Sequence, residues 1–87
     1  MDKIMENVKD TLRAFIMHYA DIPEDDPDFN DDVDLFDYGY VDSLGATEIL
    51  LYLEDTFHIT ITQEDITLYP MNTVNEIAEV AERKLNG

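Results

Sequence analysis

The sequence contains no cysteine, and only 5 of its 87 residues are lysine or arginine. Without thiols, the chain can form no disulfide, no thiolate metal site and no cysteine nucleophile. Residues 1–4 begin no long apolar run and lead to no small-residue cleavage site, so we expect no signal peptide. No apolar stretch approaches the roughly 20 residues that a membrane-spanning helix needs. We therefore expect a cytoplasmic protein that does not insert into membranes.

Acidic residues dominate the charge. Twenty-one aspartates and glutamates give a formal net charge of -16. Such a field repels nucleic acid and anionic membranes, so it excludes both as partners and favours proteins with basic patches. The alternative is that the acidity only keeps a small domain soluble. With 45% hydrophobic residues, the chain can bury one core, and we expect residues 1–87 to form one domain and a monomer.

Apolar residues recur every three or four positions between residues 2 and 20, which predicts a first helix. This set comprises Ile4, Val8, Leu12, Phe15, Ile16 and Tyr19. Pro23 marks its end, because proline disfavours helical backbone in the residue before it. A long loop follows over residues 21–41. Its expected anchors to the core are Val33, Leu35 and Phe36.

A second helix is predicted over residues 43–57, where two apolar sets lie on different faces. The first set forms one buried stripe: Ala46, Ile49, Leu50, Leu53 and Phe57. The second set is Leu44, Thr47 and Leu51, with Tyr52 beside it. This second face is either buried under the long loop or left open as a surface for a partner.

The rest of the chain predicts two more helices. Ile59 and Ile61 anchor an extended linker, and Thr62 begins a short helix that carries Ile66 and Leu68. Thr73 and Glu76 have the spacing of a capping box at the start of the last helix. The predicted fold is therefore all-α, a four-helix bundle of three main helices and one short helix with a long first loop.

Ser43, at the start of the second helix, is the candidate for chemistry. Taken locally, Asp42 or Ser43 is simply the helix N-cap. A hydrolase nucleophile is disfavoured, because Val41 stands where the serine elbow needs glycine and neither His18 nor His58 has an evident role as a base. No catalytic residue is therefore assigned. A serine modified by another enzyme needs only exposure, and a helix N-terminus suits an attached phosphodiester.

The surrounding motifs resemble those of acyl and peptidyl carrier proteins. In that family a D-S-L segment opens a helix of the form x-x-x-E-L-x-x-x-L-E-x-x-F. Asp42-Ser43-Leu44 begins the same pattern here, and Glu48, Leu53-Glu54 and Phe57 continue it. The family's upstream and downstream motifs also occur in order, in Asp34-Leu35-Phe36 with Gly39, Glu64-Asp65-Ile66, and Thr73-Val74 with Ile77.

This resemblance implies a carrier and not an enzyme. Ser43, flanked by Asp42 and Leu44, would receive 4'-phosphopantetheine from coenzyme A through a phosphopantetheinyl transferase. The arm would then hold an acyl or aminoacyl thioester, supplied by an adenylating or acyl-loading enzyme and used by downstream enzymes with basic patches. The implied docking face comprises Leu44, Thr47, Glu48, Leu51 and Tyr52.

Gly45 departs from fatty-acid carriers, which have an acidic residue after D-S-L. Together with the upstream D-L-F-x-x-G, it looks more like D-alanyl carrier proteins and stand-alone peptidyl carriers. We therefore favour an aminoacyl or specialised acyl cargo. The alternatives are an ordinary fatty-acid acyl carrier protein and an unmodified acidic helical module that binds a basic partner.

The acidic loop offers a weaker candidate site. Six of its residues have the spacing of calcium ligands in an EF-hand: Asp26, Asp28, Asn30, Asp32, Asp34 and Asp37. Asp31 stands where the turn needs glycine, and Asp37 where the bidentate glutamate belongs. We predict no dedicated metal site, only a solvated loop or weak divalent binding. Tyr38 and Tyr40 flank Gly39 just before the serine, and one of them is expected to pack inward.

Overall fold

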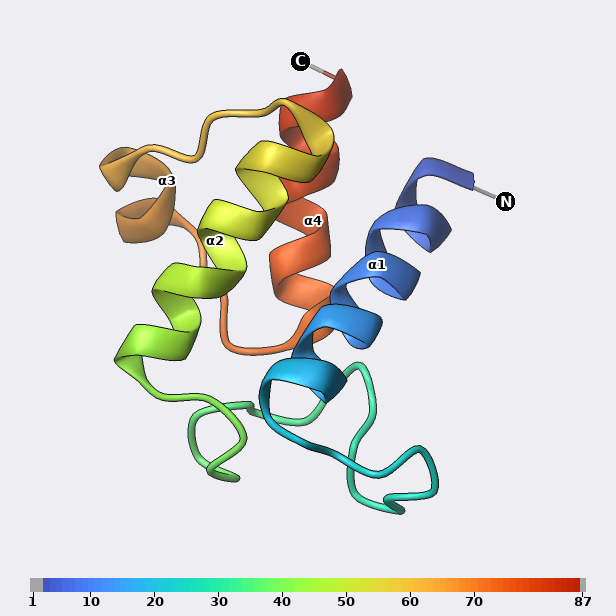
Figure 1. Cartoon of the computed structure of the whole chain (residues 1–87). Coiled ribbons are helices and arrows are strands. Elements are labelled where there is room, and N and C mark those ends of the chain that lie inside the picture. The colour runs from blue at the N-terminus through green and yellow to red at the C-terminus, as the bar shows by residue number, and fades with distance from the viewer. Residues whose placement is uncertain (1–2, 87) are drawn as a thin grey trace.

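The computed structural model describes residues 3–86, with side chains from residue 6 onward. It contains four helices and, within this range, no strand: α1 (Lys3–Tyr19), α2 (Ser43–Phe57), α3 (Gln63–Leu68) and α4 (Val74–Asn86). Helix α1 runs antiparallel to α2 and α4, and the short α3 lies outside α2 (Figure 1). The predicted all-α bundle with a long first loop is confirmed.

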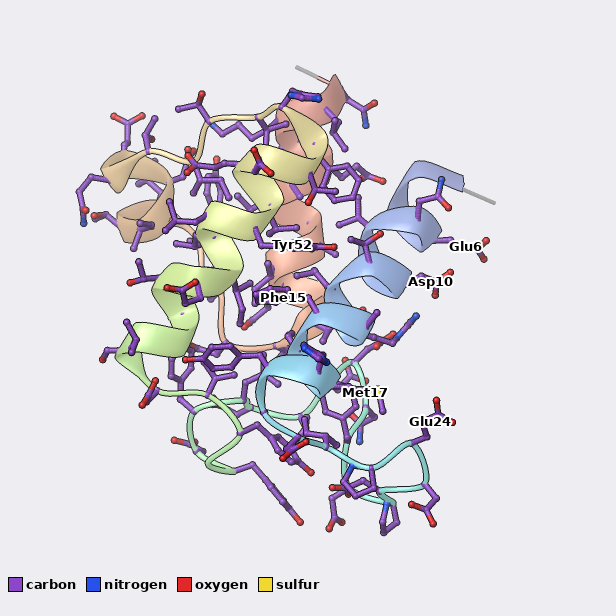
Figure 2. The ribbon with its side chains drawn as sticks, viewed as in Figure 1. Glu6, Asp10, Phe15, Met17, Glu24 and Tyr52 are labelled. Atoms are coloured by element: carbon purple, nitrogen blue, oxygen red, sulfur yellow. The ribbon has the colours of Figure 1, made fainter. Side chains whose placement is uncertain are left out.

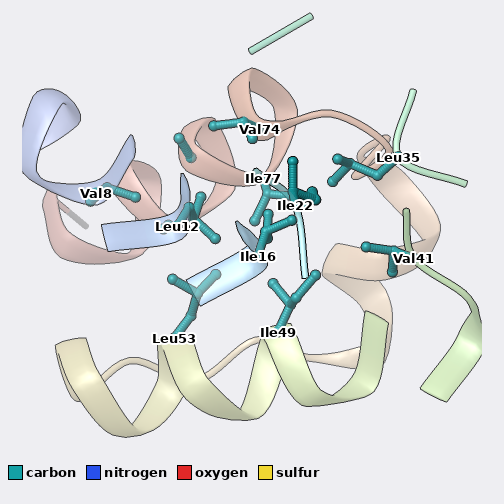
Figure 3. Close-up of a cluster of buried hydrophobic side chains, with 12 residues drawn as sticks. Val8, Leu12, Ile16, Ile22, Leu35, Val41, Ile49, Leu53, Val74 and Ile77 are labelled. Carbon is teal, nitrogen blue, oxygen red and sulfur yellow. The ribbon is translucent and has the colours of Figure 1, made fainter. Parts of the chain in front are cut away.

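The core forms where α1 faces α2 and α4. Three residues of α1, spaced by four, are completely buried: Val8, Leu12 and Ile16. Ile49 and Leu53 meet them from α2, and Val74 and Ile77 from α4 (Figure 3). Residues four apart share one helix face, so each helix presents one apolar stripe to the others. This packing explains why the regular spacing of apolar residues in the sequence was enough to place the main helices.

Side chains define the starts of the helices. Thr62 and Asp65 form a reciprocal capping box at α3. At α4, Thr73 Oγ1 accepts a hydrogen bond from the Glu76 amide at 3.1 Å, whereas the Glu76 carboxylate accepts from the Asn72 amide and not from Thr73. The predicted box is therefore present in a shifted form. It still satisfies amides that have no partner inside the helix.

Asp65 does more than cap α3. It is 8% exposed, the only polar or charged residue in the buried set of the described chain. Lys84 Nζ of α4 lies 2.7 Å from Asp65 Oδ2, and Thr62 donates two hydrogen bonds to the same oxygen. The hydrogen bond with Lys84 is the main reason that the pKa of Asp65 falls to about 2. A charged pair thus joins the shortest helix to the last one.

The long loop is tied to both α1 and α4. Arg13 Nε and Nη2 each donate to the Asp31 carboxylate at 2.6 Å, a bidentate pair that lowers the pKa of Asp31. The Asn75 amide of α4 donates to the Asp31 carbonyl at 3.1 Å. The Leu35 amide donates to the carbonyl of Asn72, just before α4, at 2.8 Å, and Leu35 itself is fully buried. The loop is therefore fixed at several points along its length.

The predicted loop anchors are right for two residues and wrong for one. Leu35 is buried and Val33 is partly buried against the core, but Phe36 is 37% exposed. Ile22 and Val41, at the two ends of the loop, are buried instead. Ile22 and Val41 adjoin α1 and α2, and their side chains belong to the same buried cluster as Leu35.

The two ends of α2 lie at opposite ends of the molecule. The start of α2 lies beside the long loop, whereas the start of α1 and the end of α4 lie toward the other end of the bundle (Figure 1). Within residues 3–86, no helix is long and apolar enough to span a membrane.

Candidate functional site at the start of helix α2

Asp42, and not Ser43, is the cap of α2. Its backbone is extended, and its carboxylate Oδ1 accepts a hydrogen bond from the Gly45 amide at 2.8 Å. Its carbonyl accepts from the Ala46 amide at 2.9 Å. Asp42 thus satisfies the first turn through both its side chain and its backbone. The capping role that local sequence left open between the two residues falls to Asp42, so the Ser43 hydroxyl is not needed for it.

Ser43 is the first residue of α2, and its side chain is exposed. Its hydroxyl makes no hydrogen bond to any residue that the structure describes; only its carbonyl is bonded, by the Thr47 hydroxyl at 3.2 Å. His18 is exposed in the last turn of α1, and His58 caps the opposite end of α2. Over residues 3–86, nothing activates Ser43 as a nucleophile, but an external enzyme can reach it.

The local geometry fits an attached phosphodiester. The Ser43 and Leu44 amides have no carbonyl partner among the described residues, as expected for the first two positions of a helix. These amides and the positive end of the helix dipole favour an anion beside the serine. The hydroxyl is exposed, so an arm linked to it can extend into solvent. The donor set is therefore compatible with a phosphate-linked group on this side chain.

The second apolar face of α2 is open. Leu44 is 65% exposed and Leu51 55%, and Thr47 and Glu48 are exposed beside them. Burial under the loop, one of the two expectations for this face, is therefore wrong for Leu44 and Leu51. Tyr52 differs from the others, because it is half-buried and its ring stacks on Phe15 of α1 with centroids 4.2 Å apart (Figure 2). Four of the five predicted docking residues form an exposed face, and Tyr52 lies at the α1–α2 contact.

A mainly apolar pocket of about 530 Å³ lies beside this face, between α2, α3 and the long loop. It is lined from α2 by Ala46, Ile49 and Leu50, and from α3 by Ile66, Thr67 and Leu68. Sequence periodicity placed Ile66 and Leu68 on α3 but missed the pocket, and both remain substantially exposed. The signal in the sequence that could have indicated the pocket was the presence of these two apolar residues on a helix of only six residues.

Several side chains of the acidic loop accept hydrogen bonds from the loop's own backbone. Asp26, Asn30 and Asp34 each accept a hydrogen bond from an amide two residues ahead. Such Asx turns give three of the six residues with EF-hand-like spacing a structural role within the loop. No group of three or more acidic or histidine side chains among the described residues is placed to hold a metal ion.

Of the two tyrosines before Ser43, one packs inward, as expected, and the other is exposed. Tyr40 is partly buried, packs edge-on against Phe29, and donates to Asp26 at 3.2 Å. Tyr38 is 50% exposed and stacks on Tyr40 with centroids 5.0 Å apart. A hydrogen bond to Asp28 is the main reason that the pKa of Tyr38 rises to about 12. The exposed ring is the one free to contact a group near the serine.

Comparison with known proteins identifies the family. A model described as the phosphopantetheine attachment site matches residues 10–81, which includes most of α1 and α4 and all that lies between them. The chain belongs to the phosphopantetheine carrier family. It is a carrier protein, and its cofactor is a covalently attached 4'-phosphopantetheine. The members of this family are not catalytic themselves; they work with phosphopantetheinyl transferases and acyl-loading enzymes.

Similar carriers carry the name D-alanyl carrier protein. One from Streptococcus uberis is 43% identical over 56 residues, which cover 64% of this chain and 70% of the relative. Another from Streptococcus pyogenes is 41% identical over 51 residues, 59% of this chain and 65% of the relative. A third, from Streptococcus mutans, is 42% identical over 48 residues, 55% of this chain and 61% of the relative.

Proposed function

We propose that Ser43 is the residue that carries the phosphopantetheine arm. The observation that carries this proposal is that Ser43 is the only serine in the chain, and it stands exposed at the start of α2. In the transfer, the Ser43 oxygen would attack the phosphorus that bears the pantetheine, and the bond to the departing adenosine bisphosphate would break. The serine proton would pass to a base of the transferase, since the described residues supply none. Asp42 would hold the turn, and Leu44 would flank the arm.

Intact mass spectrometry tests the attachment. The protein is incubated with coenzyme A and a promiscuous transferase, and we expect a mass gain equal to one phosphopantetheine. Ser43→Ala should show no gain. Thr56→Val removes an exposed hydroxyl at the other end of the same helix, and it should accept the arm like the wild type. A folded wild-type protein that gains no mass with several transferases would refute the proposal, as would a gain in Ser43→Ala.

We propose an aminoacyl group, of the kind that D-alanyl carriers are named for, as the cargo. Three relatives with that name at 41 to 43% identity support it. An adenylating enzyme would load the amino acid onto the arm, and a downstream enzyme would use it. The mass of the group attached to protein purified from its host tests the proposal. A mass gain that corresponds to an amino acid is expected, and a fatty acyl chain would contradict it.

One observation favours a fatty-acyl cargo as the second candidate. The mainly apolar pocket of about 530 Å³ beside α2 is large enough for part of an alkyl chain. Holo protein loaded with octanoate or with alanine separates the two cargoes. A fatty-acyl carrier should gain thermal stability with octanoate, and Leu50→Gln should abolish the gain. Equal melting temperatures for the two loaded forms would remove this support.

We further propose that Leu44, Thr47, Glu48 and Leu51 dock partner enzymes, with Tyr52 supporting them from the α1–α2 contact. An exposed apolar centre with an acidic neighbour suits brief contacts with basic surfaces. Leu51→Ala and Glu48→Gln should each raise the KM of the loading enzyme for the carrier. The effect of Glu48→Gln should shrink as salt rises. Leu85→Ala, at an exposed leucine near the end of α4, is the control and should leave KM unchanged.

The remaining parts of the proposal concern the setting of the carrier. We propose that the chain has no catalytic activity of its own, that residues 1–87 form one carrier domain, and that it is monomeric and cytoplasmic. The family match over residues 10–81 and the cysteine-free sequence support these points. An unmodified interaction module is the competing reading: it predicts that Ser43→Ala keeps full function in cells. Sedimentation and cell fractionation test the oligomeric state and the location.

A further inference from the structure

Gly45 has no room for a side chain. A Cβ atom built on it would lie 2.9 Å from Tyr19 Cε2 and 3.0 Å from Val41 Cγ1. The first contact is closer than Cβ atoms approach their neighbours, and the second is at that limit. Gly45 is therefore enclosed between the end of α1 and the segment that leads into α2. The ring of Tyr19 rests on the first turn of α2 because residue 45 is glycine.

The Tyr19 ring is held in place from the side of α1. It stacks on Phe15, one helical turn earlier, with centroids 6.1 Å apart and planes inclined by 19°. Phe15 in turn stacks on Tyr52 in the middle of α2. Figure 2 shows Phe15 and Tyr52 between the two helices. Three aromatic rings thus form a continuous row along the α1–α2 contact, so the position of Tyr19 is coupled to the packing of both helices.

Ser43 depends on this contact because its own side chain anchors nothing. It lies two residues before Gly45 in the same helical turn, and its hydroxyl has no hydrogen bond within the described chain. The turn is held by the Asp42 cap, by buried Val41 and by the Tyr19 ring. Of these three groups, only the ring belongs to α1, so it joins the turn directly to that helix.

We propose that Tyr19 is a positioning residue for Ser43, and that Tyr19 and Gly45 form a matched pair. The ring on Gly45 sets the separation between the end of α1 and the first turn of α2. It thereby sets the direction in which the serine hydroxyl is presented to the transferase. This inference rests on the proposed attachment at Ser43.

The pair also gives a reason for the glycine at position 45 that does not involve the cargo. A side chain at position 45, including the acidic one of fatty-acid carriers, requires the ring at position 19 to be absent or displaced. The glycine then follows from the tyrosine and not from the cargo. The specific expectation is that Gly45→Asp is tolerated together with Tyr19→Ala but not alone.

Transfer kinetics with coenzyme A and one transferase test the pair through four variants. Gly45→Ala displaces the partly exposed ring from the turn and Tyr19→Ala removes the ring, and we expect each to lower kcat/KM by about 10-fold or more, mainly through kcat. Tyr19→Phe keeps the ring and should transfer at the wild-type rate. In the double variant Tyr19→Ala/Gly45→Ala, the new methyl group occupies space that the ring left. Its rate should exceed the product of the two single effects by several-fold.

A stability control separates positioning from general damage. Val8→Ala removes a fully buried side chain of α1 far from the site, and it should lower stability while the folded protein accepts the arm at the wild-type rate. The inference is overturned if Gly45→Ala and Tyr19→Ala both transfer like Val8→Ala, or if their effects simply multiply. If Gly45→Ala does not fold, the transfer rates of Tyr19→Ala and Tyr19→Phe are compared, and equal rates would overturn the inference. If the wild type accepts no arm, the proposed attachment itself is refuted. If the wild type accepts the arm and the variants at positions 19 and 45 accept it equally fast, only the positioning inference fails.

Discussion

Helices α2 and α4 are similar in length, 15 and 13 residues, but they use their apolar residues differently. Helix α4 buries Val74, Ile77, Ala78, Val80 and Ala81, and its polar residues are partly or fully exposed. Helix α2 buries only Gly45, Ile49 and Leu53, and it leaves Leu44 and Leu51 in solvent. This exposed apolar surface of α2 is the face that we propose for docking. Substitutions in the two helices should therefore separate stability from partner contact.

The largest effect is expected from the buried faces. Ile77→Ala in α4 removes a side chain that is 3% exposed and should lower the free energy of unfolding by about 2–5 kcal/mol. Leu51→Ala in α2 should change it by less than about 0.5 kcal/mol. Leu53→Ala, a buried site in α2, should match Ile77→Ala. Urea denaturation measures all three, and a large loss for Leu51→Ala would mean that this face is structural.

The N-caps of the two helices should be equivalent for stability and different for function. Asp42→Ala and Thr73→Ala each remove an oxygen that accepts from a first-turn amide, which should cost about 0.5–2 kcal/mol. Only Asp42→Ala should also slow transfer of the arm, because its turn carries Ser43. Denaturation and transfer kinetics are compared for both variants. Equal slowing by Thr73→Ala would show that transfer responds to stability alone.

The C-terminus of α2 contains a residue with a left-handed backbone. His58 has a φ of 56°, a conformation that glycine adopts without steric cost. His58→Gly should therefore raise the free energy of unfolding by about 0.5–1 kcal/mol. Asp55→Gly, three residues earlier in helical backbone, should lower it by about 0.3 kcal/mol, the difference in helix propensity between aspartate and glycine. If both glycines destabilise the protein, the strain at residue 58 is negligible.

The smallest effect concerns the helix dipoles. Helix α4 has Arg83 and Lys84 in its last turn, whereas α2 has no basic residue there. Thr56→Lys makes the end of α2 resemble that of α4 and should add about 0.3–1 kcal/mol at low salt. Thr56→Gln controls for helix propensity. The difference between the two variants should vanish in high salt, and a difference that persists there would exclude an electrostatic origin.

The sequence was sufficient for the features that depend on local rules. Apolar periodicity located α1, α2 and α4, and the capping patterns at Thr62 and Thr73 located the starts of the last two helices. The ordered motifs around Ser43 gave the carrier family, which the comparisons confirm. Each of these signals lies within a few residues of the structure that it predicts.

Features that depend on distant residues were missed or misplaced. Asp65 was assigned as part of a helix start, but its burial depends on Lys84, nineteen positions later. Phe36 was expected to be an anchor because it is apolar, although the loop has no period to say which side chains point inward. The closest contact that a Cβ atom at Gly45 would make is with Tyr19, on another helix. Such contacts arise only once the helices pack.

The placement of the chain ends has a practical consequence. The start of α1 and the end of α4 lie toward the end of the bundle opposite to the start of α2 (Figure 1). A fluorescent protein fused at either terminus, or a linker that fixes the protein to a sensor surface, would therefore extend away from the serine. The carrier could be immobilised or labelled while its loading by a visiting enzyme is followed, with the start of α2, where we propose the arm to be attached, left unobstructed.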